Sequence, residues 1–312
     1  MKVTLLAGGT GGAKMAHGFA QVLDPGDLTV IVNVADDTEQ FGLHVSPDLD
    51  AVLYTLAGLA NPDTGWGVAG DTWTALEMLE RYGEPTWFRV GDADLATHVR
   101  RSRLLREGAS LTDATALQAT ALGVASRVLP ATDDHLRTIL QTDGGEIEFQ
   151  DYFVRLRQEP EVRALRLDGL EAAHPTEAVL AAIGGAEAIV LAPSNPIVSI
   201  GPILALRGLR EAIEAAGKAG TPRLAVSPII AGQALKGPAD RMLVSLGHES
   251  SALGIARIYQ GLVHTFVLDE ADATLAPAIE ALGMRALALP TVMRTDADRA
   301  TLARALLAAV PA

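Results

Sequence analysis

The first residues able to do chemistry lie in a glycine-rich turn behind an N-terminal apolar run. The turn, Gly8-Gly9-Thr10-Gly11-Gly12-Ala13-Lys14, matches neither the GxxxxGK[ST] phosphate loop nor the GxGxxG dinucleotide fingerprint. Its glycines still let backbone N–H groups approach a ligand, and the helix expected to follow adds positive partial charge. A tight turn with a solvated lysine is the alternative. The residues predicted to bind phosphate are Gly9, Thr10, Gly11, Gly12 and Lys14.

Acidic residues end the second predicted strand and begin the helix after it. Asp36 and Asp37 lie at the strand end, where α/β folds place their ligands. On the following helix Asp50 flanks the apolar stripe, whereas Asp48, roughly 200° away around the axis, is predicted to face solvent. Because Mg²⁺ prefers a few carboxylates plus phosphates and waters, we predict that Asp36 and Asp50 hold one Mg²⁺. Ordinary first-turn acidic residues are the alternative.

Two later turns combine small polar residues with a predicted helix start. "APSNPIVSIGPI" offers Ser194 and Asn195, and "SPIIAGQALKGPADRM" offers Ser227 and Lys236. Such turns suit phosphate or a nucleotide base, so we predict that these four residues bind the ligand. Plain loops are the alternative.

The one basic concentration lies in "WFRVGDADLATHVRRSRLLREG". Most of its arginines are predicted to lie on a solvated helix face, while Arg89, beside a Val-Gly turn, is predicted to point into a cleft. Trp66, Trp73 and Trp87 lie near this segment and either stack on a flat ring or belong to the core.

Composition limits the classes of function. The 312 residues carry a formal net charge of −13, which disfavours DNA, RNA and anionic membranes as partners. Without cysteine there is no thiolate chemistry, and no two histidines have the i,i+4 zinc spacing. We find no signal-like or membrane-length apolar segment, and expect a cytoplasmic protein acting on small molecules.

The elements that must position these residues follow an α/β pattern. Short β-branched runs alternate with helical periodicity, which predicts a doubly wound, Rossmann-like and mostly parallel sheet. Strands are predicted at Val3–Ala7, Leu28–Val34, Ala188–Ala192, Leu224–Pro228 and Thr265–Leu268, and helices at Ala13–Leu23, Pro47–Leu59, Pro202–Ala216, Pro238–Leu246 and Ala273–Leu282.

The middle of the chain has a different residue pattern from the alternating strands and helices on either side. Residues 1–84 and 181–312 are predicted to form the core, and residues 85–180 an inserted lid or substrate subdomain. The insertion has helical patterns at Arg100–Glu107 and Asp113–Leu122 and a hairpin-like stretch, "DGGEIEFQDYFVRL".

Several of these blocks also carry a family resemblance over nearly the whole chain. In this order, "GGTGGAK", "NVADD", "SPDLDAVLYTLAGL", "WFRVGDADLATH", "APSNPIVSIGPI", "SPIIAGQALKGPADRM" and "DEADA" resemble the 2-phospho-L-lactate and phosphoenolpyruvate transferases of coenzyme F420 biosynthesis. The resemblance implies a Mg²⁺-dependent transferase that moves a phospho-three-carbon-acid unit from a guanosine diphosphate-linked donor to the ribityl hydroxyl of the deazaflavin Fo, releasing GMP. It also implies a homodimer.

The resemblance assigns some residues and leaves others open. It implies that Asp50 and Arg89 contact Fo and that Asp36 holds the metal, while Ala93 stands where many relatives have arginine. Asp50 can orient or deprotonate the attacking hydroxyl or ligate the metal, and both roles stay open. The acid carried by the donor stays open among 2-phospholactate, phosphoenolpyruvate and 3-phosphoglycerate.

Two other classes compete with the transferase. A non-catalytic nucleotide-sugar-binding regulator of the related gluconeogenesis-factor type shares a similar glycine-rich opening, but the "SPDLDAVLYTLAGL" and "WFRVGDADLATH" blocks favour the transferase. The failed GxGxxG frame counts against a Rossmann oxidoreductase.

Overall fold

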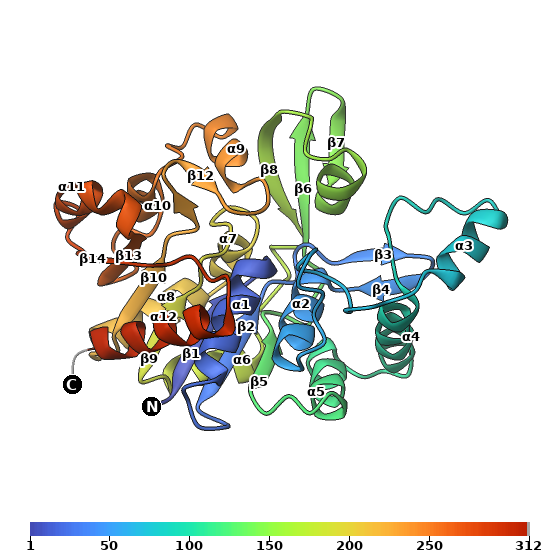
Figure 1. Ribbon diagram of the computed structural model, residues 1–312, viewed down its shortest axis with the longest axis horizontal. Helices are drawn as coiled ribbons and strands as arrows, with labels where there is room; N and C mark the ends of the chain where they lie inside the picture. Colours follow the sequence, from blue (N-terminus) through green and yellow to red (C-terminus); the bar gives the residue numbers. More distant parts are fainter. Residues whose placement is uncertain (311–312) are drawn as a thin grey trace.

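A seven-stranded parallel sheet forms the centre of the computed structural model, which describes residues 1–310 (Figure 1). In spatial order its strands are β14 (Arg285–Leu289), β13 (Thr265–Asp269), β10 (Arg223–Val226), β9 (Ala188–Leu191), β1 (Val3–Ala7), β2 (Leu28–Val32) and β5 (Arg127–Pro130). The doubly wound α/β class predicted from the sequence is confirmed.

Helices cover both faces of the sheet because alternate strand residues bury apolar side chains on each face. In β1, Leu5 packs with one hydrophobic cluster and Leu6 with the other. The helices of the Leu5 face are α1 (Gly9–Ala20), α2 (Pro47–Leu56), α5 (Leu111–Ala121) and α12 (Asp296–Ala309). Those of the Leu6 face are α6 (Glu177–Gly184), α7 (Ile200–Ala205), α8 (Leu209–Lys218), α9 (Ala239–Ser245), α10 (Ala252–Ile258) and α11 (Ala276–Glu280), the last preceded by the 3-10 helix η2 (Glu270–Leu275).

Smaller elements lie outside the central sheet. β6 (Arg137–Thr142), β7 (Gly145–Glu148) and β8 (Val162–Asp168) form a separate antiparallel sheet (Figure 1), and the π-helix η1 (Asp151–Arg155) follows β7. The remaining pieces are the hairpins β3 (Thr38–Gln40) with β4 (Leu43–Val45) and β11 (Ile229–Ile230) with β12 (Gln233–Ala234), and the helices α3 (Thr74–Arg81) and α4 (Asp92–Arg106).

The structure differs from the sequence-based boundaries at several points, of which three bear on the site. The helix predicted from Ala13 begins at Gly9, so the glycine turn is itself the first turn of α1. The helix predicted at 202–216 is two helices, α7 and α8, because Gly208 adopts a left-handed φ of 86° between them. Strand β5 pairs with β2, so the range 85–180 contributes one strand to the core sheet and is not an insertion throughout.

The order of the strands locates the site. From β1 the chain first adds β2 and β5 on one side, then continues with β9, β10, β13 and β14 on the other. The switch point therefore lies between β1 and β9, and in such sheets the ligand crevice forms outside the carboxyl ends of the strands at this point.

Candidate active site

A cavity of about 670 Å³ opens at the carboxyl ends of the strands. Its walls come from the segments after β1, β2, β9, β10 and β14, together with α2, α4, η1 and two loops near residues 66 and 88. Every residue predicted to bind ligand lines this cavity except Gly12, which is buried against Ala7 and Ser194. The lining residues among those predictions are Gly9, Thr10, Gly11, Lys14, Asp36, Asp50, Arg89, Ser194, Asn195, Ser227 and Lys236.

The glycine turn is held mainly by the protein itself. The Gly8 N–H donates to Ser194 Oγ at 3.1 Å, and the Gly9 N–H donates to Asp48 Oδ1 at 2.8 Å. The N-cap residue, Gly8, has no side chain to cap α1, and the N–H groups of Gly8 and Gly9 are engaged, so those of Thr10 and Gly11 are the ones that remain for an anion in the described chain. Glycine is also needed sterically, because a Cβ at position 11 would lie 2.2 Å from the Pro193 carbonyl oxygen.

Asp48 was predicted to face solvent, and this prediction was wrong. Helix α2 packs between the glycine turn and strand β2, so both sides of its first turn are covered and Asp48 is buried. Its Oδ2 accepts a 3.0 Å hydrogen bond from the Asn33 amide, in addition to the Gly9 bond at Oδ1. Burial raises the pKa of Asp48 to about 6, although the bonds from Asn33 and Gly9 oppose this rise.

Asp36 is the cavity carboxylate with an uncommitted oxygen. It is buried, and its Oδ1 has no hydrogen-bond partner in residues 1–310. Burial, followed by the negative charge of Asp48, raises the pKa of Asp36 well above its ordinary value. A cation beside Asp36 would offset both effects.

Asp50 is also buried, but both of its oxygens contact Arg101. Arg101 NH1 donates to Asp50 Oδ2 at 3.1 Å, and NH2 donates to Oδ1. Arg101 is fully buried and is the exception to the solvated face predicted for most arginines of its segment, since Arg100, Arg103 and Arg106 are exposed. The pair holds because the Asp50 charge offsets the burial that would otherwise lower the Arg101 pKa, and the net shift of that pKa is upward.

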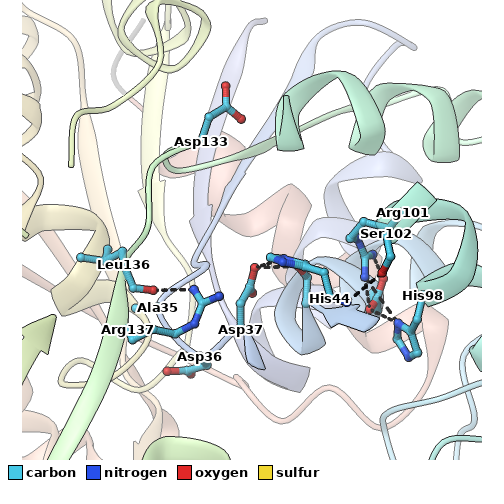
Figure 2. Close-up of polar contacts among 12 residues, drawn as sticks. Ala35, Asp36, Asp37, His44, His98, Arg101, Ser102, Asp133, Leu136 and Arg137 are labelled. Atoms are coloured by element: carbon cyan, nitrogen blue, oxygen red, sulfur yellow. Dashed lines mark hydrogen bonds and ion pairs between the residues drawn. The ribbon is translucent and has the colours of Figure 1, made fainter. Parts of the chain in front are cut away.

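A second polar cluster extends the ion pair along α4. His98 lies beside Arg101 (Figure 2), and its Nε2 is 3.3 Å from Asp94 Oδ1. Tyr54 of α2 donates to the same oxygen at 2.7 Å. Burial alone would raise the pKa of Asp94, but the His98 and Tyr54 contacts lower it overall. The Tyr54 hydrogen bond joins α2 to α4 beside the cavity.

Asp37 has a structural contact rather than a place in the cavity. In Figure 2 its carboxylate points at His44, whereas Asp36 points away. His44 Nε2 lies 2.8 Å from Asp37 Oδ2, and the Ser46 hydroxyl donates to the same oxygen at 2.7 Å. This cluster fastens the β3–β4 hairpin to the start of α2.

The basic residues of the cavity lack acidic partners. Five lysine or arginine side chains line it, and none forms an ion pair within residues 1–310. Burial, then the charges of Arg299 and Lys236, lower the pKa of Lys14. Positive charge is thus concentrated where an anion would relieve it. The five are Lys14, Arg89, Arg157, Lys236 and Arg294.

Two of the predicted hydroxyl ligands already donate hydrogen bonds to backbone carbonyls of the protein. Ser194 Oγ donates to the Gly8 carbonyl at 2.7 Å, and Ser227 Oγ donates to the Ile229 carbonyl at 2.9 Å. Asn195 Oδ1 accepts from the Ile197 N–H at 2.9 Å, which leaves its amide group toward Met242 and the cavity. These residues shape the wall that closes the switch point.

Aromatic side chains form another wall. Phe149 and Phe153 stack with centroids 5.6 Å apart, and Trp66 meets Phe153 edge-on at 6.0 Å. Trp87 lines the cavity as well, while Trp73 lies under the Arg89 guanidinium at 4.4 Å. Trp66 is 53% exposed, so it is available to a flat ligand ring rather than being a core residue.

Residues 1–310 contain no group of three or more histidine and acidic side chains arranged to hold a metal. Over the same residues, no helix combines the length and apolar character that a membrane span requires. A metal in this cavity would therefore be shared between few carboxylates and the ligand.

The fold and the cavity together define a doubly wound α/β protein with a cavity lined by basic side chains and buried aspartates at its switch point. The family model for "2-phospho-L-lactate transferase CofD" matches residues 3–293, and the chain belongs to this family.

Curated relatives agree over nearly the whole length. The chain is 43% identical to the phosphoenolpyruvate transferase of Streptomyces griseus, covering 96% of this chain and 94% of that protein. It is 39% identical to the 2-phospho-L-lactate transferase of Methanothermobacter thermautotrophicus, covering 98% and 97%. The protein is therefore a transferase of this family.

A solved structure has the same fold. The UPF0052 family protein BH3568 of Bacillus halodurans superposes with a TM-score of 0.65 at 17% identity, covering 98% of this chain and 100% of that one. At this identity the likeness concerns the fold alone.

Sequence reasoning missed several residues of the site. Asn33 and Arg101 lie in the segments "NVADD" and "WFRVGDADLATHVRRSRLLREG" but were not predicted as site residues, because each acts through a partner that only packing brings near. Asp48 had a signal, the first carboxylate of "SPDLD", which helical geometry alone assigned to the wrong face.

Proposed function

We propose that the protein transfers a phospho-three-carbon-acid unit, 2-phospholactate or phosphoenolpyruvate, from a guanosine diphosphate-linked donor to the ribityl hydroxyl of Fo, releasing GMP. The observation that carries this proposal is the occurrence, in one cavity, of five basic side chains without ion pairs in the described chain and four buried aspartates, Asp36, Asp48, Asp50 and Asp94. A donor with two phosphates and a carboxylate matches such a basic lining, and family membership supports the transfer.

The transfer needs positioning and charge neutralisation rather than a protein nucleophile. The Fo hydroxyl oxygen bonds to the phosphorus that carries the acid, the bond from this phosphorus to the GMP oxygen breaks, and the hydroxyl proton is released. Lys14 and the free N–H groups of Thr10 and Gly11 stabilise the negative charge that develops on the leaving phosphate.

Asp50 is suited to bind the acceptor hydroxyl. Asp50, held in place by Arg101, accepts a hydrogen bond from the ribityl hydroxyl and orients it. A carboxylate with both oxygens on a guanidinium is a weak base, so this geometry favours the orienting role over proton removal. The stacked phenylalanines and Trp66 offer a surface for the deazaflavin ring.

The cavity also fits a bound Mg²⁺ in part. Asp36 offers a buried, unpartnered oxygen, and its pKa is raised first by burial and then by the negative charge of Asp48. Asp50 is engaged by Arg101, so Asp36 would be the principal ligand and Asp50 a neighbour that binds the metal only if its ion pair loosens. When bound there, Mg²⁺ would neutralise charge on the donor phosphates.

The test is a direct assay. Purified protein is incubated with Fo, Mg²⁺ and, separately, the guanylylated forms of 2-phospholactate, phosphoenolpyruvate and 3-phosphoglycerate, while GMP release and the mass of the deazaflavin product are followed. One donor is expected to give GMP and a new product in equal amounts. Tight ligand binding without product from every donor would contradict the proposal and favour a regulator.

A further inference from the structure

Residues 61–67, here called the strap, cross one side of the cavity between α2 and α3. The isolated bridge between Ala60 and Val68 closes the base of the strap, and the Asn61 N–H donates to the Gly67 carbonyl at 3.1 Å. Inside it, the Gly65 N–H donates to the Asn61 carbonyl at 2.9 Å. The strap is therefore a compact unit with its own hydrogen bonds.

The tip of the strap makes few contacts with the rest of the protein. Lys236 Nζ donates to the Thr64 carbonyl at 3.0 Å, and Trp66 meets Phe153 edge-on. None of residues 61–67 is buried, although Gly65, Trp66 and Gly67 line the cavity. A segment with so little buried surface opens at low free-energy cost.

A side chain at position 65 would crowd the side chains of Lys236 and Thr10. A Cβ there would be 2.9 Å from both Lys236 Nζ and Thr10 Cγ2, and the φ of 82° is left-handed. The strap thus touches the glycine turn and the Lys236 loop at one point. Lys236 is also close enough to Lys14 that its charge lowers the pKa of that residue.

We propose that Lys236 is a positioning residue that latches the strap, so that an anion bound between Lys236 and Lys14 closes the strap and sets Trp66 over the acceptor. The ammonium group has three N–H donors, and so keeps the Thr64 carbonyl while it donates to an anion. Binding of the donor then orders the strap, including Trp66, which forms the wall of the cavity beside the acceptor. This inference rests on the proposed function, since it assigns the anion to the donor's phosphates.

Hydrogen exchange of residues 59–69 tests the latch, with GDP plus Mg²⁺ as the probe. In the wild type, GDP is expected to slow exchange in the strap by about fivefold or more. Lys236→Met, compared at equal GDP occupancy measured by calorimetry, is expected to lose this protection, and Lys236→Arg to keep much of it. In assays, Lys236→Met is expected to raise the KM for Fo even when the donor is saturating.

A matched glycine pair separates contact from backbone strain. Gly65→Ala places a methyl group against Lys236 and Thr10 and is expected to abolish the protection. Gly70→Ala, at a φ of 67° with no atom within 4 Å of the added carbon, is expected to retain it.

The outcomes distinguish the two proposals. GDP binding with unchanged exchange in the wild type, or protection that persists in Lys236→Met, would overturn the latch and leave the transferase standing. No GDP binding to the wild type would overturn both.

Discussion

Asp50 on α2 and Arg101 on α4 form a buried, two-point ion pair at the wall of the cavity. The two residues are 51 positions apart in the chain and meet only because α4 packs beside the start of α2. A buried pair of this kind costs desolvation, so breaking it leaves an uncompensated charge. Stability and function are therefore coupled at Asp50.

The first prediction concerns Arg101. Arg101→Gln leaves the buried Asp50 carboxylate without its partner, and we expect the free energy of unfolding in urea to fall by about 3–5 kcal/mol. Arg100→Gln, on the exposed side of the same helix, is the control and should stay within about 0.5 kcal/mol of the wild type.

The double variant separates structure from chemistry. Asp50→Asn combined with Arg101→Gln removes both charges, so much of the lost stability should return while turnover stays low. A double variant as unstable as Arg101→Gln alone would contradict the ion-pair account, and near-normal turnover in it would remove Asp50 from the mechanism.

The second prediction concerns pH and Asp48. Its pKa is about 6 in the folded protein against an ordinary 3.8, so between these values the unfolded state loses its proton first and the free energy of unfolding falls as pH rises. In Asp48→Asn this contribution is absent. From about pH 4 to about pH 7 the variant should therefore gain roughly 2–3 kcal/mol relative to the wild type in urea titrations. A difference that does not change with pH would refute this origin of the shift.

The third prediction concerns the packing of the glycine turn. A Cβ at Gly8 would lie 2.6 Å from Asp48 Oδ2 and from Ser199 Cβ, so Gly8→Ala should displace Asp48 or Ser199 and cost about 1–3 kcal/mol. Turnover should fall with it. Gly184→Ala, where nothing lies within 4 Å, is the control, and equal effects of the two substitutions on thermal unfolding and turnover would speak against the steric argument.

The fourth prediction concerns metal binding. Asp36→Asn removes the unpartnered buried carboxylate oxygen, and we expect the Mg²⁺ concentration for half-maximal turnover to rise by about tenfold or more. Asp24→Asn, at an exposed position remote from the cavity lining, should leave the Mg²⁺ titration unchanged. The same titration curve for Asp36→Asn and the wild type would exclude Asp36 as a metal ligand.

The local sequence pattern was sufficient to predict the arrangement of the central sheet and its helices. Buried β-branched runs such as Leu28–Val32 and the periodic apolar stripe of α2 predict a parallel sheet with helices on both faces, because burial on both sides demands continuous apolar strands. The edge strand β14 and the second edge strand β5 were not predicted, since their patterns are weaker and their place depends on neighbours.

The sequence by itself determined which turns meet at the cavity, because parallel strands bring all their carboxyl ends to one edge. Only the tertiary structure decided how the charges are shared there. The Gly9 N–H donates to Asp48 and is therefore not free for phosphate. Arg101 pairs with Asp50, and the Lys236 ammonium donates to the Thr64 carbonyl of the strap. Each of these contacts joins segments at least 39 residues apart, and a hydrogen bond across such a distance follows from packing, not from local pattern.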